Sequence, residues 1–140
     1  MLKNLVLPAR ILFAAIFVFA GFNHFSSQTI AYAASAGVPL ANLAVPLSGV
    51  MAIVGGLSVA AGYHTKWGAL LLVAFLVPVT LKLHAFWDVT DPMMRQLAMA
   101  MFMKNVALVG SALSFAYFGA GPYSLDARRE SRGKLAHAVA

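Results

Sequence analysis

The chain has 140 residues, of which 61% are hydrophobic and 10% are charged, and its formal net charge is +6. Soluble domains carry about 25% charged residues, so this composition excludes an ordinary water-soluble domain. No Lys, Arg, Asp or Glu occurs from Ile11 to Thr65. Four of the ten cations, Arg128, Arg129, Arg132 and Lys134, lie in the polar C-terminal segment, which is a membrane-flanking pattern and argues against nucleic-acid binding. The absence of cysteine excludes disulfides, Cys-ligated iron–sulfur clusters and covalently attached c-type haem.

Four segments are long and apolar enough to cross a bilayer as helices, which takes about 20 residues each. In chain order they run from about Leu7 to Phe25, Asn42 to Gly62, Lys66 to Trp87 and Arg95 to Phe118. None shows the two-residue alternation of a transmembrane strand, and only helices and closed barrels satisfy their backbone groups in lipid. The sequence therefore predicts an all-α membrane protein, with a four-helix transmembrane bundle in residues 1–126 and a basic cytoplasmic tail in 127–140.

A short interfacial helix is expected between the first two spans, in Ser26–Val38, and Pro39 prevents it from continuing into the second span. The triplet Ala31-Tyr32-Ala33 in this segment also resembles the site at which a secretory signal is removed, so cleavage after the first apolar run is an alternative. Arg10 argues against cleavage, because it interrupts the apolar run that a signal needs.

The distribution of Lys and Arg predicts which ends of the spans face the cytoplasm. The connection between the first two spans carries none, whereas the N-terminal region, the second connection and the tail carry Lys3, Arg10, Lys66, Arg128, Arg129, Arg132 and Lys134. With an even number of spans, this pattern places both termini on the cytoplasmic side of a bacterial inner membrane. The interfacial helix and His84 then lie toward the outer side.

Three cations lie within or close to the apolar spans, namely Arg10, Lys82 and Lys104. A charge at bilayer depth costs roughly 2.5–3.5 kcal/mol, so each needs a partner, a route to the interface or a function. Because helical side chains lean toward the N-terminus, Arg10 is expected to snorkel to the cytoplasmic interface, with an internal ion pair or a ligand contact as the alternative. Lys82 is expected to reach water on the outer side, whereas Lys104 lies deeper and is expected to face a protein partner.

His84 and Asn105 are expected beside Lys104, because consecutive antiparallel spans joined by a short turn bring them to similar depths. Two readings of this group stay open. The side chains either join the helices by hydrogen bonds or form a polar pocket open to the outer leaflet, which Phe86 and Trp87 would line.

His24 ends the first span on the same side as His84, so the two imidazoles could ligate a haem or a metal. This signal is weak, because neither histidine has a second histidine three or four residues away and no carboxylate cluster supports them.

Seven short motifs occur in order along the chain: Arg10, Gly21-Phe22-Asn23-His24, Gly37-Val38-Pro39, Gly55-Gly56-Leu57, His84-Ala85-Phe86-Trp87, Lys104-Asn105-Val106-Ala107-Leu108-Val109-Gly110 and Gly121-Pro122-Tyr123-Ser124-Leu125-Asp126. In this order and spacing they resemble the DoxX family of small four-span bacterial and archaeal membrane proteins, over about residues 5–126. The resemblance implies association with membrane redox systems. Some members resemble the small subunit of thiosulfate:quinone oxidoreductase, and others associate with oxidative-stress or thiol-handling complexes.

Two positions depart from the family pattern. Where many members have a Lys after the Gly-Phe of the first span, this chain has His24. Where many have a Glu three residues before the paired glycines, it has Ala52. The second span therefore lacks the obvious counter-ion or proton-handling acid.

The first functional hypothesis is a subunit of, or accessory to, a membrane redox complex that contacts a quinone in the outer pocket, and any activity would be that of a quinone-linked oxidoreductase subunit. The alternatives are a non-catalytic scaffold packed against a larger complex and, in an oligomer, a small-solute conductor. Membrane lipid and a larger complex or homo-oligomer are the expected partners, and nucleic acid is not. No catalytic or metal site is assigned, and the candidate ligand contacts are His84, Lys104, Asn105, Trp87, Phe86, His24 and Arg10.

Overall fold

The computed structural model describes residues 2–139 and the side chains of residues 4–134. Residues 2–139 form helices and connecting turns, without a strand. The helices are η1 (Leu2–Leu5), α1 (Val6–Asn23), α2 (Ser27–Ser35), α3 (Ala41–Ala61), α4 (Thr65–Leu83), η2 (Phe86–Asp88), α5 (Pro92–Phe118) and α6 (Leu125–Val139). Four helices, α1, α3, α4 and α5, are long and apolar enough to cross a membrane, so the expected all-α fold with four spans is confirmed.

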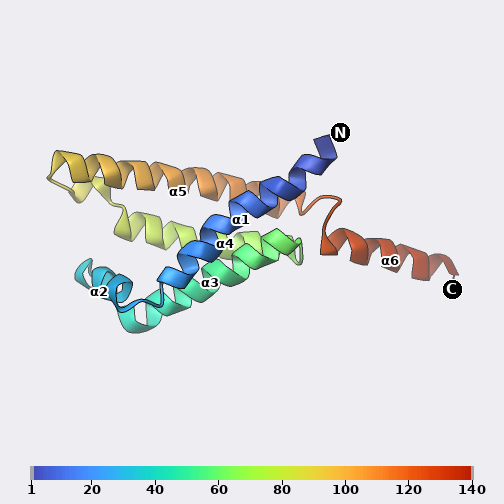
Figure 1. The fold of residues 1–140 in the computed structure, drawn as a ribbon, viewed down its shortest axis with the longest axis horizontal. Helices are drawn as coiled ribbons and strands as arrows, with labels where there is room; N and C mark the ends of the chain where they lie inside the picture. The colour runs from blue at the N-terminus through green and yellow to red at the C-terminus, as the bar shows by residue number, and fades with distance from the viewer. Residues whose placement is uncertain (1, 140) are drawn as a thin grey trace.

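The spans run up and down, so that both ends of the chain lie beyond the same end of the bundle (Figure 1). Helix α1 packs against α3, α3 against α4, and α4 against α5. We call the end that holds the start of α1, residues 62–64 and α6 the terminal end. The end that holds α2 and residues 84–91 is the opposite end. The assignment of the terminal end to the cytoplasm stays a prediction from charge.

The short helix expected between the first two spans is present as α2. Its N-cap is Ser26, whose Oγ accepts a hydrogen bond from the Thr29 N–H at 3.2 Å. Ala33 of α2 is buried in a cluster with Ala41 and Val45 from the first turns of α3. This contact fastens α2 to the opposite end of the bundle.

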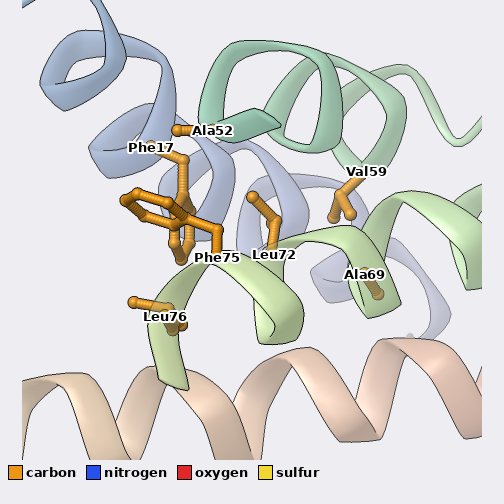
Figure 2. Packing of buried hydrophobic residues seen from close by; sticks show 7 residues of the cluster. All are labelled: Phe17, Ala52, Val59, Ala69, Leu72, Phe75 and Leu76. Carbon is orange, nitrogen blue, oxygen red and sulfur yellow. The ribbon is translucent and has the colours of Figure 1, made fainter. Parts of the chain in front are cut away.

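The core lies where α1, α3 and α4 meet. Its buried side chains are Phe17, Ala52, Val59, Ala69, Leu72, Phe75 and Leu76 (Figure 2). Phe17 and Phe75 meet edge to face, with 6.4 Å between their ring centroids. Lipid tails are as apolar as these side chains, so close packing, rather than escape from water, holds the spans together.

Glycines let the backbones of α1, α3 and α4 approach closely. A Cβ atom at Gly49 of α3 would lie 2.8 Å from the carbonyl oxygen of Gly21 in α1 and 2.8 Å from Cβ of His24. A Cβ atom at Gly55 would lie 3.0 Å from the carbonyl oxygen of Gly68 in α4. The helices would have to separate to admit a side chain at this position, so Gly49 sets the distance between α1 and α3.

Helix α5 is the least buried span. Only 11% of its apolar stretch is buried, against 33% for α3. Its buried residues are Asn105 and Ala112, while large apolar side chains such as Met93 and Met103 are exposed. Helix α5 therefore presents most of its surface to lipid or to another protein.

Replacing Gly49 with Ala is expected to lower the free energy of unfolding by about 1–3 kcal/mol, because the added methyl group pushes α1 and α3 apart. The matched control is Gly110→Ala in α5, where a Cβ atom meets nothing within 4 Å. Thermal unfolding of the detergent-solubilised chain, followed by circular dichroism, measures both. Equal melting temperatures for the two variants would contradict the close approach at Gly49.

Candidate functional site

Arg10 is buried at the terminal end of the bundle, with 1% of its surface exposed. Its Nη1 donates a hydrogen bond to the carbonyl oxygen of Ala120 at 2.6 Å. Its Nη2 donates to the carbonyl oxygens of Ala60 at 3.2 Å and Tyr123 at 2.9 Å. Ala60 lies in the last turn of α3, and the other two residues lie in the connection between α5 and α6. A single side chain of α1 thus holds the end of α3 and the α5–α6 connection together.

The expectation that Arg10 snorkels to the interface is wrong, because the side chain is buried and its guanidinium binds main-chain carbonyls of other segments. The last carbonyl groups of a helix lack partners within the helix and carry partial negative charge, so they are suitable acceptors for a buried cation. The chain reversal at Gly62, with φ +66°, leaves room for the guanidinium, because a Cβ atom there would lie 2.8 Å from Arg10 Nη1. Burial of Arg10 therefore depends on a glycine whose left-handed backbone also suits the turn.

Asp126, in the first turn of α6, caps the N-terminus of α4. Its carboxylate accepts hydrogen bonds from the main-chain N–H of His64 at 2.9 Å and of Thr65 at 3.1 Å, and from the Thr65 hydroxyl at 3.1 Å. The Asp126 N–H in turn donates to the carbonyl oxygen of Gly62 at 2.8 Å. These bonds fix the start of α6 to the turn between α3 and α4, where the positive end of the α4 dipole favours an anion.

Two opposing effects act on the pKa of Asp126. Burial raises it, but the hydrogen bonds from the Thr65 N–H, the His64 N–H and the Thr65 hydroxyl outweigh burial and hold this pKa below its usual value of 3.8. The carboxylate is thus charged at neutral pH, and the cap is strongest in that form.

Arg129 adds a third attachment of α6 to the same turn. Its Nη1 lies 3.1 Å from Nε2 of His64, and its guanidinium carbon lies 5.3 Å from the centroid of the Tyr63 ring, a cation–π distance. The basic segment expected as a tail from residue 127 is thus helical in α6, which begins at Leu125.

Asn105, in the middle of α5, joins this helix to the last turn of α4. It is 5% exposed, and its Nδ2 donates to Oγ1 of Thr80 at 3.0 Å. The Thr80 hydroxyl donates in turn to the carbonyl oxygen of Leu76 at 2.6 Å. Asn105 therefore forms a hydrogen bond between two helices, which is one of the two roles that the sequence left open for His84, Lys104 and Asn105.

His84 and Lys104 lie near this bond, beside a group of aromatic rings. His84 is half-buried at the end of α4, and Lys104 of α5 is exposed but close enough for its charge to act on the imidazole. The centroids of Phe86, Trp87 and Phe102 lie 5.1 to 5.7 Å apart in edge-to-face contacts. The structure thus brings the Lys104 charge within range of the His84 imidazole, and the rings of the aromatic trio belong to residues two or three positions from these two in the sequence.

His24 and Lys82 take part in other contacts. His24 Nδ1 lies 2.7 Å from Oγ of Ser48, and its ring centroid lies 5.6 Å from that of Phe75. The Lys82 side chain is exposed and lies over Gly37, in the turn after α2, with Nζ 3.4 Å from where a Cβ atom would stand. Within the part of the chain that the structure describes, no three or more His, Asp or Glu side chains gather into a group that could hold a metal.

Two cavities lie at the terminal end, which the sequence did not single out as a binding region. One of ≈ 970 Å³ is lined by Arg10, Arg128 and Arg132 together with apolar side chains. The other, of ≈ 710 Å³, is lined by residues that include His64, Asp126 and Arg129. The sequence signal that could have indicated the first cavity is the four-residue spacing of Arg128 and Arg132, which places both side chains on one face of a helix.

This fold and these end contacts define a small integral membrane protein with four spans. The chain belongs to the DoxX family, whose model matches residues 5–85, that is, α1 to the end of α4. Two relatives from Escherichia coli strain K12 extend the likeness over most of the chain. The inner membrane protein YphA is 32% identical over 126 residues and covers 89% of each chain. The inner membrane protein YqjF is 32% identical over 124 residues, which are 86% of this chain and 88% of the relative.

No solved structure matches the chain. The family and its relatives, with the four apolar spans, confirm the expected multi-pass location in a bacterial inner membrane.

Changing Arg10 to Lys is expected to loosen the α5–α6 connection, because one ammonium group cannot hold carbonyl oxygens on two segments as a planar guanidinium does. A hydrogen bond to a charged group contributes about 1.5–3 kcal/mol, so trypsin should cleave after Arg128 and Arg129 at least about tenfold faster. The control is Arg95→Lys, at an exposed position of α5; neither change removes a trypsin site or a charge. Cleavage of both variants at the wild-type rate would refute the clamp.

Changing Asp126 to Asn is expected to lower the melting temperature at pH 7 and to lower it progressively less as the pH falls below about 4. The folded-state pKa of Asp126 is below its unfolded value, so the stabilisation is present above about pH 4 and is lost as the pH falls through the folded pKa. Glu130→Gln, on the same helix and exposed, is the control. A difference between Asp126→Asn and wild type that stays constant from pH 7 to pH 3 would exclude the charged cap.

Proposed function

We propose that this chain is an integral membrane subunit of a redox complex and that His84 and Lys104, with Phe86 and Trp87, contact a quinone headgroup at the opposite end. The supporting observation is a pair of polar groups without internal partners. Among the described residues, no hydrogen bond uses the His84 ring or the Lys104 ammonium, whereas the neighbouring Asn105 amide is bonded to Thr80, whose hydroxyl bonds the backbone of α4.

The chemistry of these side chains suits a quinone. An ammonium and an imidazole N–H both donate hydrogen bonds, and the two carbonyl oxygens of a quinone accept them. Phe86 and Trp87 offer apolar ring surface to the flat quinone ring, as small-molecule sites commonly do. The exposed face of α5 lies against the bilayer, so membrane-soluble quinones reach such a site directly from the lipid.

The other candidate residues take different parts in this proposal. Asn105 positions α5 against α4 and does not contact the ligand, since its amide already bonds Thr80. His24 lies between α1 and α3 with Ser48, and Arg10 lies at the terminal end, so both are outside the proposed contact. Ala52, at the position where many family members carry an acid, is fully buried in the core, which leaves proton handling to a partner subunit.

The test is the quinone content of the purified chain. Wild-type protein extracted in mild detergent is expected to carry quinone, measured by solvent extraction and chromatography. Lys104→Met should reduce that content about tenfold or more, because it removes a charged hydrogen-bond donor. Lys82→Met is the matched control, since it removes an exposed lysine near the same end that lies over the turn after α2.

An equal quinone content in Lys104→Met and Lys82→Met would exclude the proposed contact. A wild-type preparation that carries no quinone would favour the second candidate, a non-catalytic scaffold packed against a larger complex or a second copy of the chain. The observation that favours the scaffold is the low burial of α5, of which 11% of the apolar stretch is covered. Cross-links formed from α5 in native membranes, and absent from α1, would support it.

A further inference from the structure

We propose that Arg10, Arg128 and Arg132 bind the phosphate of an anionic phospholipid. The cavity that would hold it lies between the start of α1, the end of α3 and the first turns of α6. This site lies at the terminal end, away from the proposed quinone contact, and does not depend on it. The cavity measures ≈ 970 Å³ and contains no Asp or Glu among its lining residues.

The first support is the incomplete hydrogen bonding of Arg10. Its Nε is buried and has no hydrogen-bond partner in the part of the chain that the structure describes. The three acceptors that it does have are neutral main-chain carbonyls. Buried polar groups in folded proteins nearly always have partners, so an unpartnered N–H on a cation that lines a cavity points to an anionic oxygen there.

The second support is the separation of charge around α6. Arg128 and Arg132 stand four residues apart, on one face of α6, and both line the same cavity as Arg10. The acids Asp126 and Glu130 line the other cavity instead. The Asp126 carboxylate is already bound to the N-terminus of α4. Helix α6 therefore lines the Arg10 cavity with two of its arginines and neither of its acids, although the charge of Asp126, held at the start of α4, also acts on Arg10.

The third support is that the same cavity is also apolar and lies at the level where the spans end. Leu7, Ala60, Ala61 and Leu125 line it, and Leu7 and Leu125 are 36% and 43% exposed. Leu7 is in the first turn of α1, and the two alanines end α3. A free phosphate ion gains nothing from contact with apolar side chains, whereas a phospholipid carries its phosphate next to its acyl chains, which pack against them. Basic clusters directly next to a membrane span are typical of anionic-lipid binding.

The experiment titrates the full-length, detergent-purified chain with phosphatidylglycerol or phosphatidylcholine and counts bound lipids by native mass spectrometry. Phosphatidylglycerol should bind more tightly than phosphatidylcholine. Arg128→Gln and Arg132→Gln should each weaken it about fivefold, the effect of one basic residue at a membrane surface. Lys134→Gln, on the same helix but outside the cavity lining, should leave it unchanged. Both arginines are exposed and neither belongs to the Arg10 clamp, so the fold is kept.

Three results would overturn the proposal. Equal binding of the two lipids would show that charge is not recognised. Equal losses in Arg128→Gln, Arg132→Gln and Lys134→Gln would show a general effect of surface charge. If inorganic phosphate alone, at the same concentration, raised the melting temperature as much as phosphatidylglycerol does, the site would bind a free anion rather than a lipid.

Discussion

The buried guanidinium of Arg10 is the contact on which the terminal end of this protein depends. It binds carbonyl oxygens from the end of α3 and from the connection that follows α5, so three spans are fixed by one side chain of α1. Because Arg10 is buried, water does not compete for these carbonyl oxygens, which makes such a bond stronger than it would be in water. The Asp126 cap depends on the same arrangement, because the α5–α6 connection held by Arg10 leads directly into it.

The rest of the bundle is held by close packing. Glycines let the backbones of α1 and α3, and of α3 and α4, approach closely, and a small apolar core fills the space between these helices. Helix α5 stands apart from this pattern, since Asn105 and Ala112 are its buried residues and most of its methionines are exposed, while Leu108, Val109 and Phe115 pack against the core and stay only partly buried. Three spans thus form a compact unit, while the fourth is the natural surface for a ligand or partner in the membrane.

The two ends of the protein offer different chemistry. The opposite end combines a cation and an imidazole with aromatic rings, which suits a flat, weakly polar ligand. The terminal end combines three arginines with apolar walls, which suits an anionic headgroup. The core between them has Ala52 where many family members carry an acid, so no charged side chain of α3 links the two ends. We therefore regard the two proposed sites as independent.

The sequence by itself determined the number and approximate limits of the spans, because the thickness of the hydrocarbon layer fixes how many apolar residues a helix needs. It also indicated α2 and placed His84 near Lys104, since a short turn between antiparallel helices leaves little freedom. Only the tertiary structure decided the role of Arg10. Its acceptors are main-chain carbonyls far away in sequence, and every residue carries such a group, so no side-chain pattern identifies them. The terminal cavities could not be predicted for the same reason, because they form where the first turns of α6 meet the turn between α3 and α4.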